Sequence, residues 1–143
     1  MAIRVLLVDD ERSFVETMQK RLAVRRLEVR MANSGPAALE ELAMDPVDVV
    51  VLDVKMPGMD GIEAIRAIKE RHPLVEVILL TGHANLEASL EGMALGAFDY
   101  LLKPVGIDEL VFKIEDAHRN KSLQEEKIRR LRATAEARSE EEG

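Results

Sequence analysis

The 143-residue sequence contains no cysteine and no tryptophan, and only one tyrosine and three phenylalanines. Without cysteine, the chain can form neither disulfides nor thiolate metal sites. No apolar run approaches the roughly 20 residues that a membrane-spanning helix requires. The first ten residues, MAIRVLLVDD, are too short an apolar run, and become acidic too soon, for a secretory signal. We therefore expect a cytoplasmic protein without a membrane partner.

Basic residues are outnumbered by acidic ones, and the formal net charge is −7. Binding to nucleic-acid phosphates requires a clustered basic surface, so this charge argues against direct nucleic-acid binding by the chain. Hydrophobic residues make up 47% of the sequence and charged residues 33%. These proportions are typical of a globular domain with one sizeable core and a charged surface.

A nearly unbroken β-branched run, residues 47–52, lies near the middle of the chain. Such a run predicts a strand that is buried on both faces of a parallel sheet. The run ends in Asp53, and a loop with Pro57, Gly58 and Gly61 follows. In open parallel sheets, functional groups lie just beyond the carboxyl ends of the strands. Asp53 is therefore the first candidate functional residue.

Further apolar segments predict strands, and amphipathic segments between them predict helices. The expected strands are residues 3–8, 27–31, 47–52, 75–80 and 98–102. The expected helices are residues 13–24, a second one capped by Asn33 or Ser34 and stopped at Asp45, then residues 60–71, 85–95 and a long helix from residue 107. In the helix at residues 85–95, the apolar spacing predicts that four side chains face the core, namely Leu86, Leu90, Met93 and Ala94.

Strands that alternate with helices predict a doubly wound α/β fold, with a five-stranded parallel sheet and helices on both of its faces. Residues 27–31 alternate apolar with charged side chains, which places this strand at one edge of the sheet. The short strand at residues 98–102 is placed at the other edge. With right-handed crossovers, the flavodoxin-like strand order 2-1-3-4-5 follows.

Polar residues directly follow four of the five predicted strands. Asp9 and Asp10 follow the first, Asp53 the third, Thr81 the fourth and Lys103 the fifth. Each of them alone has an ordinary explanation, such as an acidic helix start, a loop cap or a solvated surface charge. In the predicted strand order, however, the three carboxylates converge in one crevice, and their joint placement favours a functional site.

Three converging carboxylates repel one another, which raises their pKa values or attracts a cation. Oxygen ligands suit Mg²⁺, which binds one or two carboxylates together with water and phosphate oxygens. A carboxylate can also accept a phosphoryl group as an acyl phosphate. Such a transfer requires in-line positioning and compensation of the charge on the phosphoryl oxygens. A metal ion, Lys103 and the Thr81 hydroxyl are suited to that compensation.

The chain resembles the receiver domain of two-component response regulators across about residues 2–120. The matching motifs are LLVDDE at 6–11, VVVLDVKMPGMDG at 49–61, ILLTGH at 78–83 and FDYLLKP at 98–104. The resemblance implies a signalling switch that a histidine kinase phosphorylates on Asp53. It also implies that the domain is not an enzyme for outside substrates, because it catalyses only its own phosphorylation and dephosphorylation.

The resemblance implies a metal site as well. Asp10, Asp53 and the backbone carbonyl of Lys55 would bind Mg²⁺ directly, with Mn²⁺ as an alternative, and Asp9 would act through water. The family usually has a cis peptide bond at the position that matches Lys103–Pro104.

Four further roles follow from the resemblance. Lys103 would bind the phosphoryl group, and Thr81 would be the switch hydroxyl. Tyr100 would be the switch aromatic, which turns inward when Thr81 engages the phosphoryl group. Lys55 and His83 match positions that flank the path of the attacking water, and they are candidate modulators.

The last predicted helix continues beyond a receiver domain of residues 1–120. Ile128, Leu131 and Ala135 have spacings compatible with a coiled-coil seam. Two interpretations of the tail, residues 121–143, stay open: a charged, solvated helix that frays after about residue 120, or a signalling helix or half of a weak dimeric coiled coil that leads towards an effector. Residues 138–143 are expected to be disordered. The expected partners are a histidine kinase, a downstream effector, and a second copy that binds through the tail or through the fifth strand and its flanking helices. The arrangement resembles regulators with a downstream ATPase module, but no Walker motif is present.

Other classes of protein use a similar sheet. An aspartate-nucleophile phosphatase needs a D-x-D pattern after its first strand and an inserted cap, whereas Asp9 and Asp10 are adjacent here and the loops are short. A flavodoxin-like mononucleotide binder needs a Gly/Ser/Thr loop at that place to bind phosphate, and an Asp-Asp-Glu turn would repel it. A receiver used only for protein contact would not need the complete acidic set with Thr81 and Lys103. The phosphorylation switch is the leading interpretation.

Overall fold

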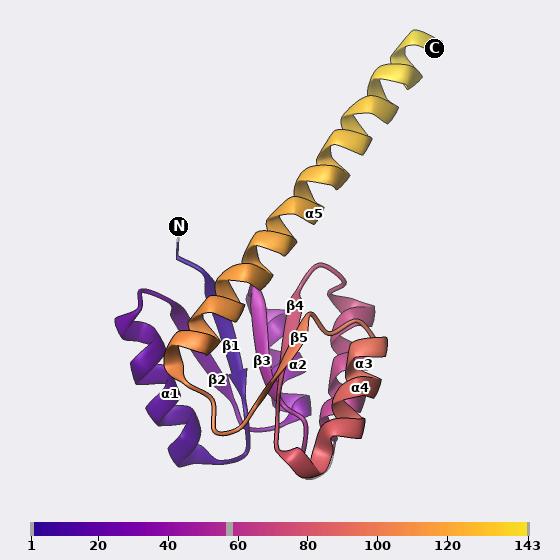
Figure 1. The fold of residues 1–143 in the computed structure, drawn as a ribbon. Coiled ribbons are helices and arrows are strands. Elements are labelled where there is room, and N and C mark those ends of the chain that lie inside the picture. The colour runs from indigo at the N-terminus through magenta and orange to yellow at the C-terminus, as the bar shows by residue number, and fades with distance from the viewer. Residues whose placement is uncertain (1, 57–58, 143) are drawn as a thin grey trace.

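The computed structural model describes residues 2–56 and 59–142, and within them strands and helices alternate as predicted (Figure 1). The strands are β1 (Arg4–Val8), β2 (Glu28–Ala32), β3 (Val49–Asp53), β4 (Glu76–Thr81) and β5 (Asp99–Leu102). The helices are α1 (Arg12–Val24), α2 (Gly35–Met44), α3 (Gly61–Arg71), the short 3₁₀ helix η1 (His83–Asn85), α4 (Leu86–Ala94) and α5 (Ile107–Glu142).

The five strands form one parallel sheet in the order β2-β1-β3-β4-β5, which confirms the predicted flavodoxin-like topology. Val8 of β1 pairs with Leu52 of β3, and Asp53 pairs with Leu80 of β4. This register brings the carboxyl ends of β1, β3 and β4 to the same edge of the sheet. The residues that follow these strands are therefore neighbours in space although they are distant in sequence.

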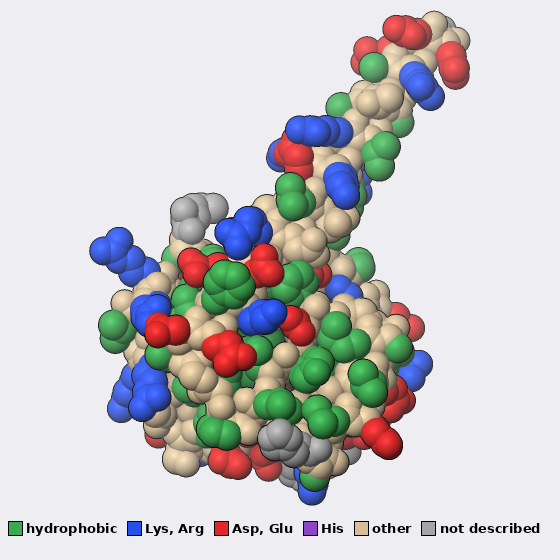
Figure 2. All heavy atoms as spheres, in the orientation of Figure 1, with side chains coloured by type: hydrophobic (Ala, Val, Ile, Leu, Met, Phe, Trp, Pro, Cys, Tyr) green, Lys and Arg blue, Asp and Glu red, His purple; other side chains and the backbone are tan. Residues whose placement is uncertain are grey.

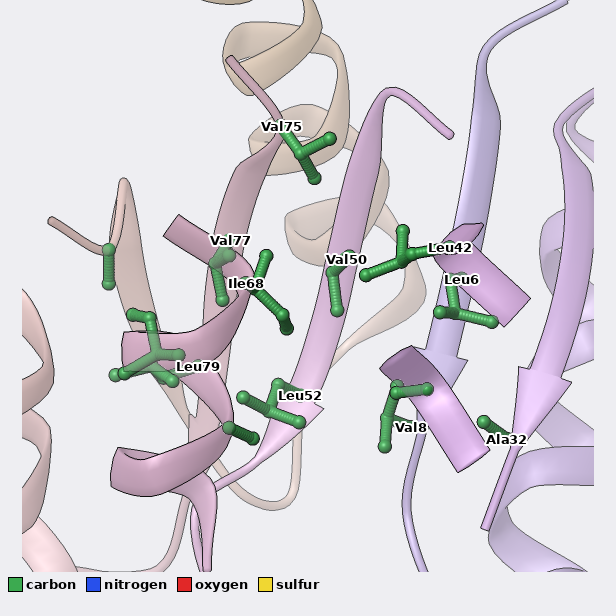
Figure 3. Close-up of a cluster of buried hydrophobic side chains, with 14 of the residues drawn as sticks. Leu6, Val8, Ala32, Leu42, Val50, Leu52, Ile68, Val75, Val77 and Leu79 are labelled. Atoms are coloured by element: carbon green, nitrogen blue, oxygen red, sulfur yellow. The ribbon is translucent and has the colours of Figure 1, made fainter. Parts of the chain in front are cut away.

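Both faces of the sheet are buried, because successive side chains of a strand point to opposite sides. Helices α2, α3 and α4 cover one face, and α1 and α5 cover the other (Figure 1). The core on the α2 and α3 side includes Leu6, Val8, Val50, Leu52, Val77 and Leu79 (Figure 3). The core on the α1 and α5 side includes Val5, Leu7, Val49, Val51, Ile78 and Leu80.

Side chains at the start of two helices stabilise the turns beside the sheet. The Ser34 hydroxyl accepts a hydrogen bond from the backbone N–H of Ala37 at 3.2 Å, which identifies Ser34 as the cap of α2. The Asp60 carboxylate accepts one from the backbone N–H of Glu63 at 2.9 Å at the start of α3. Both caps occupy backbone donors that the first helical turn would otherwise leave unpaired.

The start of α3 packs directly against the backbone that follows Asp53. The backbone N–H of Gly61 donates to the carbonyl of Val54 at 2.8 Å. A Cβ atom at Gly61 would lie 2.6 Å from Val54 Cα and 2.7 Å from its carbonyl oxygen. These contacts involve backbone atoms, so only glycine fits, and the close approach holds the segment after Asp53 in place.

The orientation of α4 differs from the prediction. Leu86 is 38% exposed and Leu90 is 66% exposed, and Ala94 is also exposed. The prediction that these three residues face the core is wrong, whereas Met93 does pack against the core. Two of the larger apolar side chains of α4 therefore lie on the surface.

The reason lies in how closely α4 approaches the sheet. Its buried residues are the small Ser89 and Gly92. A Cβ atom at Gly92 would lie 2.5 Å from Cδ1 of Leu79, a core residue of β4. Only a face of small residues permits this short separation, so packing against Leu79 determines the orientation more than apolar spacing does.

Helix α5 begins in the core and then projects from the domain (Figure 1). Leu110, Val111, Ile114 and Ala117 are buried, and the helix continues without interruption to Glu142. Both interpretations of residues 121–143, a helix that frays and a linker to an effector, stay predictions. Ion pairs between residues one helical turn apart stabilise this part of the helix. They link Lys121 to Glu125 and Arg130 to Glu126, each at 3.2 Å.

Basic, acidic and hydrophobic side chains are interspersed along this projecting segment (Figure 2). The central turns carry Lys127, Arg129, Arg130 and Arg132 around the apolar Ile128 and Leu131. Among the described residues, no helix combines the length and apolar character that crossing a membrane would require.

A buried polar network joins α5 to the amino ends of the strands, opposite the edge described above. Asp48, just before β3, accepts hydrogen bonds from the backbone and side chain of Arg4. The Lys121 ammonium lies 3.3 Å from Asp48, and the Asn120 amide donates to Glu76 at 2.9 Å. Burial raises the pKa of Asp48, but the bonds from Arg4 and Lys121 outweigh burial and hold the pKa below its ordinary value.

Candidate functional site

Three carboxylates meet at the carboxyl ends of β1 and β3. Asp9 directly follows β1 and is buried, Asp10 is exposed, and Asp53 ends β3 and is 8% exposed. Each of the three contributes a carboxylate oxygen to a cluster whose atoms all lie within 4.8 Å of one another. The structure thus brings together the three acidic residues that the predicted strand order places side by side.

The electrostatic environment of Asp53 reflects this crowding. Burial and the neighbouring Asp9 carboxylate raise the pKa of Asp53 to about 6, although the nearby Lys103 ammonium acts in the opposite direction. The backbone N–H of Lys55 donates to Asp53 at 3.5 Å. A carboxylate that is destabilised by its neighbours gains from a bound cation, so the site favours one.

Lys103 reaches the acidic cluster from the end of β5. Its ammonium donates to Asp9 Oδ2 at 2.9 Å and lies 3.7 Å from Asp53 Oδ1. Burial lowers the pKa of Lys103, but the hydrogen bond to Asp9 and the Asp53 carboxylate raise it more, so the pKa is above its ordinary value. The ammonium therefore stays charged beside the candidate phosphoacceptor. The Lys103–Pro104 peptide bond is cis.

Lys103 has a further neighbour that was not among the predicted site residues. Its ammonium lies 4.6 Å from the centre of the Phe14 ring. In the sequence, Phe14 is one of several apolar residues at helical spacing, and that spacing carries no sign of a contact with a distant lysine. The tertiary fold alone brings α1 and the end of β5 together.

The candidate switch residues lie on β4 and β5. Thr81 ends β4 and is buried, and its hydroxyl donates to the carbonyl of Gly82 at 3.2 Å. Tyr100 lies on the edge strand β5 and is 37% exposed. In this structure, therefore, the aromatic ring has not taken up a fully buried position.

Of the two candidate modulators, the structure describes the side chain of Lys55 but not that of His83. Lys55 has an exposed side chain, and its backbone lies beside Asp53. His83 begins η1, but its side chain lies outside the described part of the structure, as do Pro57 and Gly58 of the loop after Asp53. The metal-ligand role of the Lys55 carbonyl stays a prediction.

The donor set of the cluster suits a hard divalent cation. Its side-chain donors are carboxylate oxygens from Asp9, Asp10 and Asp53, and a single ammonium, that of Lys103, lies within 4 Å of them among the described residues. Three negative charges against one positive charge leave net negative charge at the site. Oxygen donors with this charge fit Mg²⁺ better than they fit softer metals.

A family model for the response regulator receiver domain matches residues 5–115 of the chain. The chain belongs to this family. Among curated relatives, the DNA-binding transcriptional regulator NtrC of Escherichia coli K12 is 42% identical over 113 residues, which cover 79% of this chain and 24% of NtrC. The regulatory protein AtoC of the same organism is 38% identical over 128 residues, covering 90% of this chain and 28% of AtoC.

Solved structures agree with this family. The crystal structure of a response regulator receiver domain protein from Clostridium thermocellum is 35% identical, covers 85% of this chain and 98% of its own, and has a TM-score of 0.82. A crystal structure of NtrX from Brucella abortus in complex with ADP is 30% identical, covers 88% of this chain and 29% of NtrX, and has a TM-score of 0.83. The receiver domain thus spans about a quarter of the length of NtrC and AtoC.

Proposed function

We propose that this receiver domain is a phosphorylation-activated switch of a two-component system, which accepts a phosphoryl group on Asp53 from a histidine kinase. The observation that carries the proposal is the meeting of three carboxylates with the Lys103 ammonium at one edge of the sheet, with Lys103 Nζ 3.7 Å from Asp53. A buried carboxylate next to a cation and an acidic metal-binding cluster is suited to accept a phosphoryl group.

In the proposed step, a carboxylate oxygen of Asp53 forms a bond to phosphorus while the bond between phosphorus and the imidazole nitrogen of the kinase breaks. That nitrogen keeps the bonding electron pair, and Asp53 becomes an acyl phosphate. With a pKa of about 6, Asp53 is largely ionised at neutral pH and is available as the nucleophile. Lys103 can then shift from Asp9 towards the phosphoryl oxygens, which attract its charge.

Asp10, Asp53 and the backbone carbonyl of Lys55 would hold Mg²⁺, and Asp9 would act through water. When bound, the ion supplies positive charge that offsets the charge of the phosphoryl oxygens. Asp9 would at the same time orient Lys103, to which it is hydrogen-bonded at 2.9 Å. Mn²⁺, which also prefers oxygen donors, is the alternative ion.

We further propose that the domain catalyses only its own phosphorylation and dephosphorylation, in the cytoplasm. The site lies at the carboxyl ends of the strands and in the segments that follow them, and its phosphoacceptor is one of the domain's own side chains. Lys55 and His83 would modulate hydrolysis of the acyl phosphate, because both follow closely after site residues in the chain, Asp53 and Thr81.

The output of the switch would pass through Thr81 and Tyr100. The Thr81 hydroxyl, which donates to Gly82 in this structure, would turn and donate to a phosphoryl oxygen. Tyr100 would then turn inward from its half-exposed position on β5. Helix α4 contacts β5, and its exposed Leu86 and Leu90 would form part of a surface that a partner recognises, either an effector or a second copy.

Phosphorylation of Asp53 is tested by incubation with acetyl phosphate and Mg²⁺, followed by intact-mass and peptide mass spectrometry. The wild type is expected to gain one phosphoryl group, whereas Asp53→Asn gains none. Glu41→Gln is the matched control, because Glu41 is an acidic residue that pairs with Arg30 and is not one of the three clustered carboxylates. An adduct that persists at the wild-type level in Asp53→Asn would remove Asp53 as the acceptor. A wild type that binds Mg²⁺ but takes up no phosphoryl group would favour a receiver used only for protein contact.

The projecting segment of α5 is proposed to link the switch to a downstream effector and to pair with a second copy. Leu131 is 70% exposed and lies on the seam with Ile128 and Ala135. Leu123 is 58% exposed and lies off the seam, so Leu123→Glu is the matched control for Leu131→Glu. Light scattering should detect a dimer of the wild type and of Leu123→Glu, and a weaker dimer of Leu131→Glu. If the wild type and both variants are monomers at high concentration, with and without a phosphoryl analogue, pairing through the seam is contradicted.

A further inference from the structure

We propose that Phe14 is a positioning residue for Lys103, and that its ring face holds the ammonium beside Asp53 where a phosphoryl group is received. The inference rests on the proposed function of the site. Its starting point is the distance of 4.6 Å between Lys103 Nζ and the centre of the Phe14 ring. A cation within about 6 Å of an aromatic ring centre is attracted by the negative charge of the ring face.

The surroundings of the ammonium divide into two kinds of partner. Asp9 Oδ2 at 2.9 Å and Asp53 Oδ1 at 3.7 Å are carboxylate partners, and the Phe14 ring is an apolar one. The Lys103 side chain is 25% exposed, so these partners enclose it only in part. The ring covers a part of the ammonium that water would otherwise hydrate, and it does so without accepting a directional hydrogen bond.

That lack of direction matters for the proposed step. Before phosphorylation, the nearest carboxylate to Lys103 is Asp9, whereas binding of a phosphoryl group on Asp53 requires the ammonium to shift towards Asp53. A hydrogen-bond acceptor in place of the ring would have to be released during this shift. The attraction of a ring face depends only weakly on the rotation of the ammonium, so Phe14 can keep its contact in both positions.

The position of the ring is itself well determined. Phe14 lies in the first turn of α1 and packs against the core between α1, α5 and the sheet, as do Val105 and Ile107. Phe14 and Lys103 also line a groove of about 410 Å³ between α1 and the segment that follows β5. A smaller residue at position 14 would widen this groove next to Lys103 and open the ammonium to water.

The alternative is that Phe14 only fills the edge of the core. Leucine fills a similar space and keeps the apolar contacts of α1, but it has no aromatic face. Tyrosine keeps the face and adds a hydroxyl that can extend into the groove. The comparison of Phe14→Leu with Phe14→Tyr therefore separates a packing role from a role of the ring.

The experiment measures beryllofluoride binding, as an acyl-phosphate mimic, and phosphorylation by acetyl phosphate, both with Mg²⁺. Small donors are used because they do not depend on docking of a kinase. Phe14→Leu is expected to weaken beryllofluoride binding and slow phosphorylation by about threefold to tenfold, whereas Phe14→Tyr stays within about twofold of the wild type. Phe112→Leu is the matched control, because Phe112 is an exposed phenylalanine of α5. Mg²⁺ binding, measured by calorimetry without beryllofluoride, should be equal in all four proteins.

A spectroscopic measurement tests the contact directly. The ε-methylene protons of Lys103 should be shifted upfield by the ring in the wild type and in Phe14→Tyr, and this shift should disappear in Phe14→Leu. The inference is overturned if Phe14→Leu binds beryllofluoride as tightly as the wild type, or if the leucine and tyrosine variants lose binding equally. If the wild type itself takes up no phosphoryl group, the proposed function fails, and the Lys103 shift alone then decides whether the ring contacts the ammonium.

Discussion

Asp48 and Asp53 lie at opposite ends of β3, are 6% and 8% exposed, and have pKa values that are displaced in opposite directions. Asp48 receives hydrogen bonds from Arg4 and an ion pair from Lys121, which together outweigh the effect of burial. At Asp53, burial and the Asp9 carboxylate outweigh the attraction of Lys103. The ionised carboxylate before the start of β3, Asp48, is thus stabilised by its neighbours, whereas the one at the carboxyl end, Asp53 in the candidate site, is destabilised by them.

The raised pKa of Asp53 predicts that Asp53→Asn stabilises the metal-free domain. A folded pKa of about 6, above the ordinary 3.8, means that Asp53 lowers stability above pH 6 and has no such effect below pH 3.8. At about pH 7.5 we expect the free energy of unfolding to increase by roughly 2–3 kcal/mol in the variant, and the gain to shrink towards about pH 4. Urea denaturation in the presence of a chelator measures this difference. An unchanged or lower stability of Asp53→Asn at neutral pH would contradict the proposed crowding of charge.

Asp48→Asn is expected to have the opposite effect. The lowered pKa of Asp48 means that its contribution to stability is present above the ordinary pKa of 3.8 and is lost as the pH falls through the folded pKa. At neutral pH the variant should lose about 1–3 kcal/mol, because Arg4 and Lys121 lose a charged buried partner. Hydrogen exchange should also become faster in α5 around Lys121. Glu41→Gln, which breaks a partly exposed ion pair with Arg30, should cost less than about 1 kcal/mol and leave α5 unaffected.

Gly61→Ala is expected to disturb the site by displacing the backbone segment that follows Asp53. The new Cβ would lie 2.6 Å from Val54 Cα, and neither backbone can move without displacing the start of α3 or the segment after Asp53. We expect a loss of about 2 kcal/mol or more in unfolding free energy, together with weaker Mg²⁺ binding. Gly82→Ala is the control, because a Cβ at Gly82 meets no atom within 4 Å, and its stability should stay within about 0.5 kcal/mol of the wild type. Equal effects of the two substitutions would show that contact with Val54 is not the cause.

Tyr100 offers a direct observation of the switch, because the chain has one tyrosine and no tryptophan. Its intrinsic fluorescence therefore reports on β5 alone. Addition of beryllofluoride and Mg²⁺ should reduce quenching of this fluorescence by acrylamide, as the half-exposed ring becomes buried. Thr81→Ala should bind the mimic but leave the quenching unchanged. If Thr81→Ala responds as the wild type does, the two residues are not coupled.

The sequence by itself determined the order of strands and helices and the convergence of three acidic residues at the carboxyl ends of the strands. Apolar runs without alternation between apolar and polar residues are typical of strands that are buried on both faces of a parallel sheet. Asp9, Asp53 and Thr81 lie at the ends of such strands, so the strand order alone made them neighbours. These features depend on local sequence patterns and on a few rules of sheet topology, so they can be predicted from the sequence.

Only the tertiary structure decided how side chains from different elements meet. Leu86 and Leu90 have the spacing of a core face, but the close approach of α4 to Leu79 requires the small Gly92 at the contact, and the two leucines stay on the surface. Interactions between distant residues, such as the Phe14 ring beside Lys103, arise from packing of whole elements and leave no local sign in the chain. Periodicity shows that a residue is apolar or charged, whereas the distance between packed elements determines what that residue contacts.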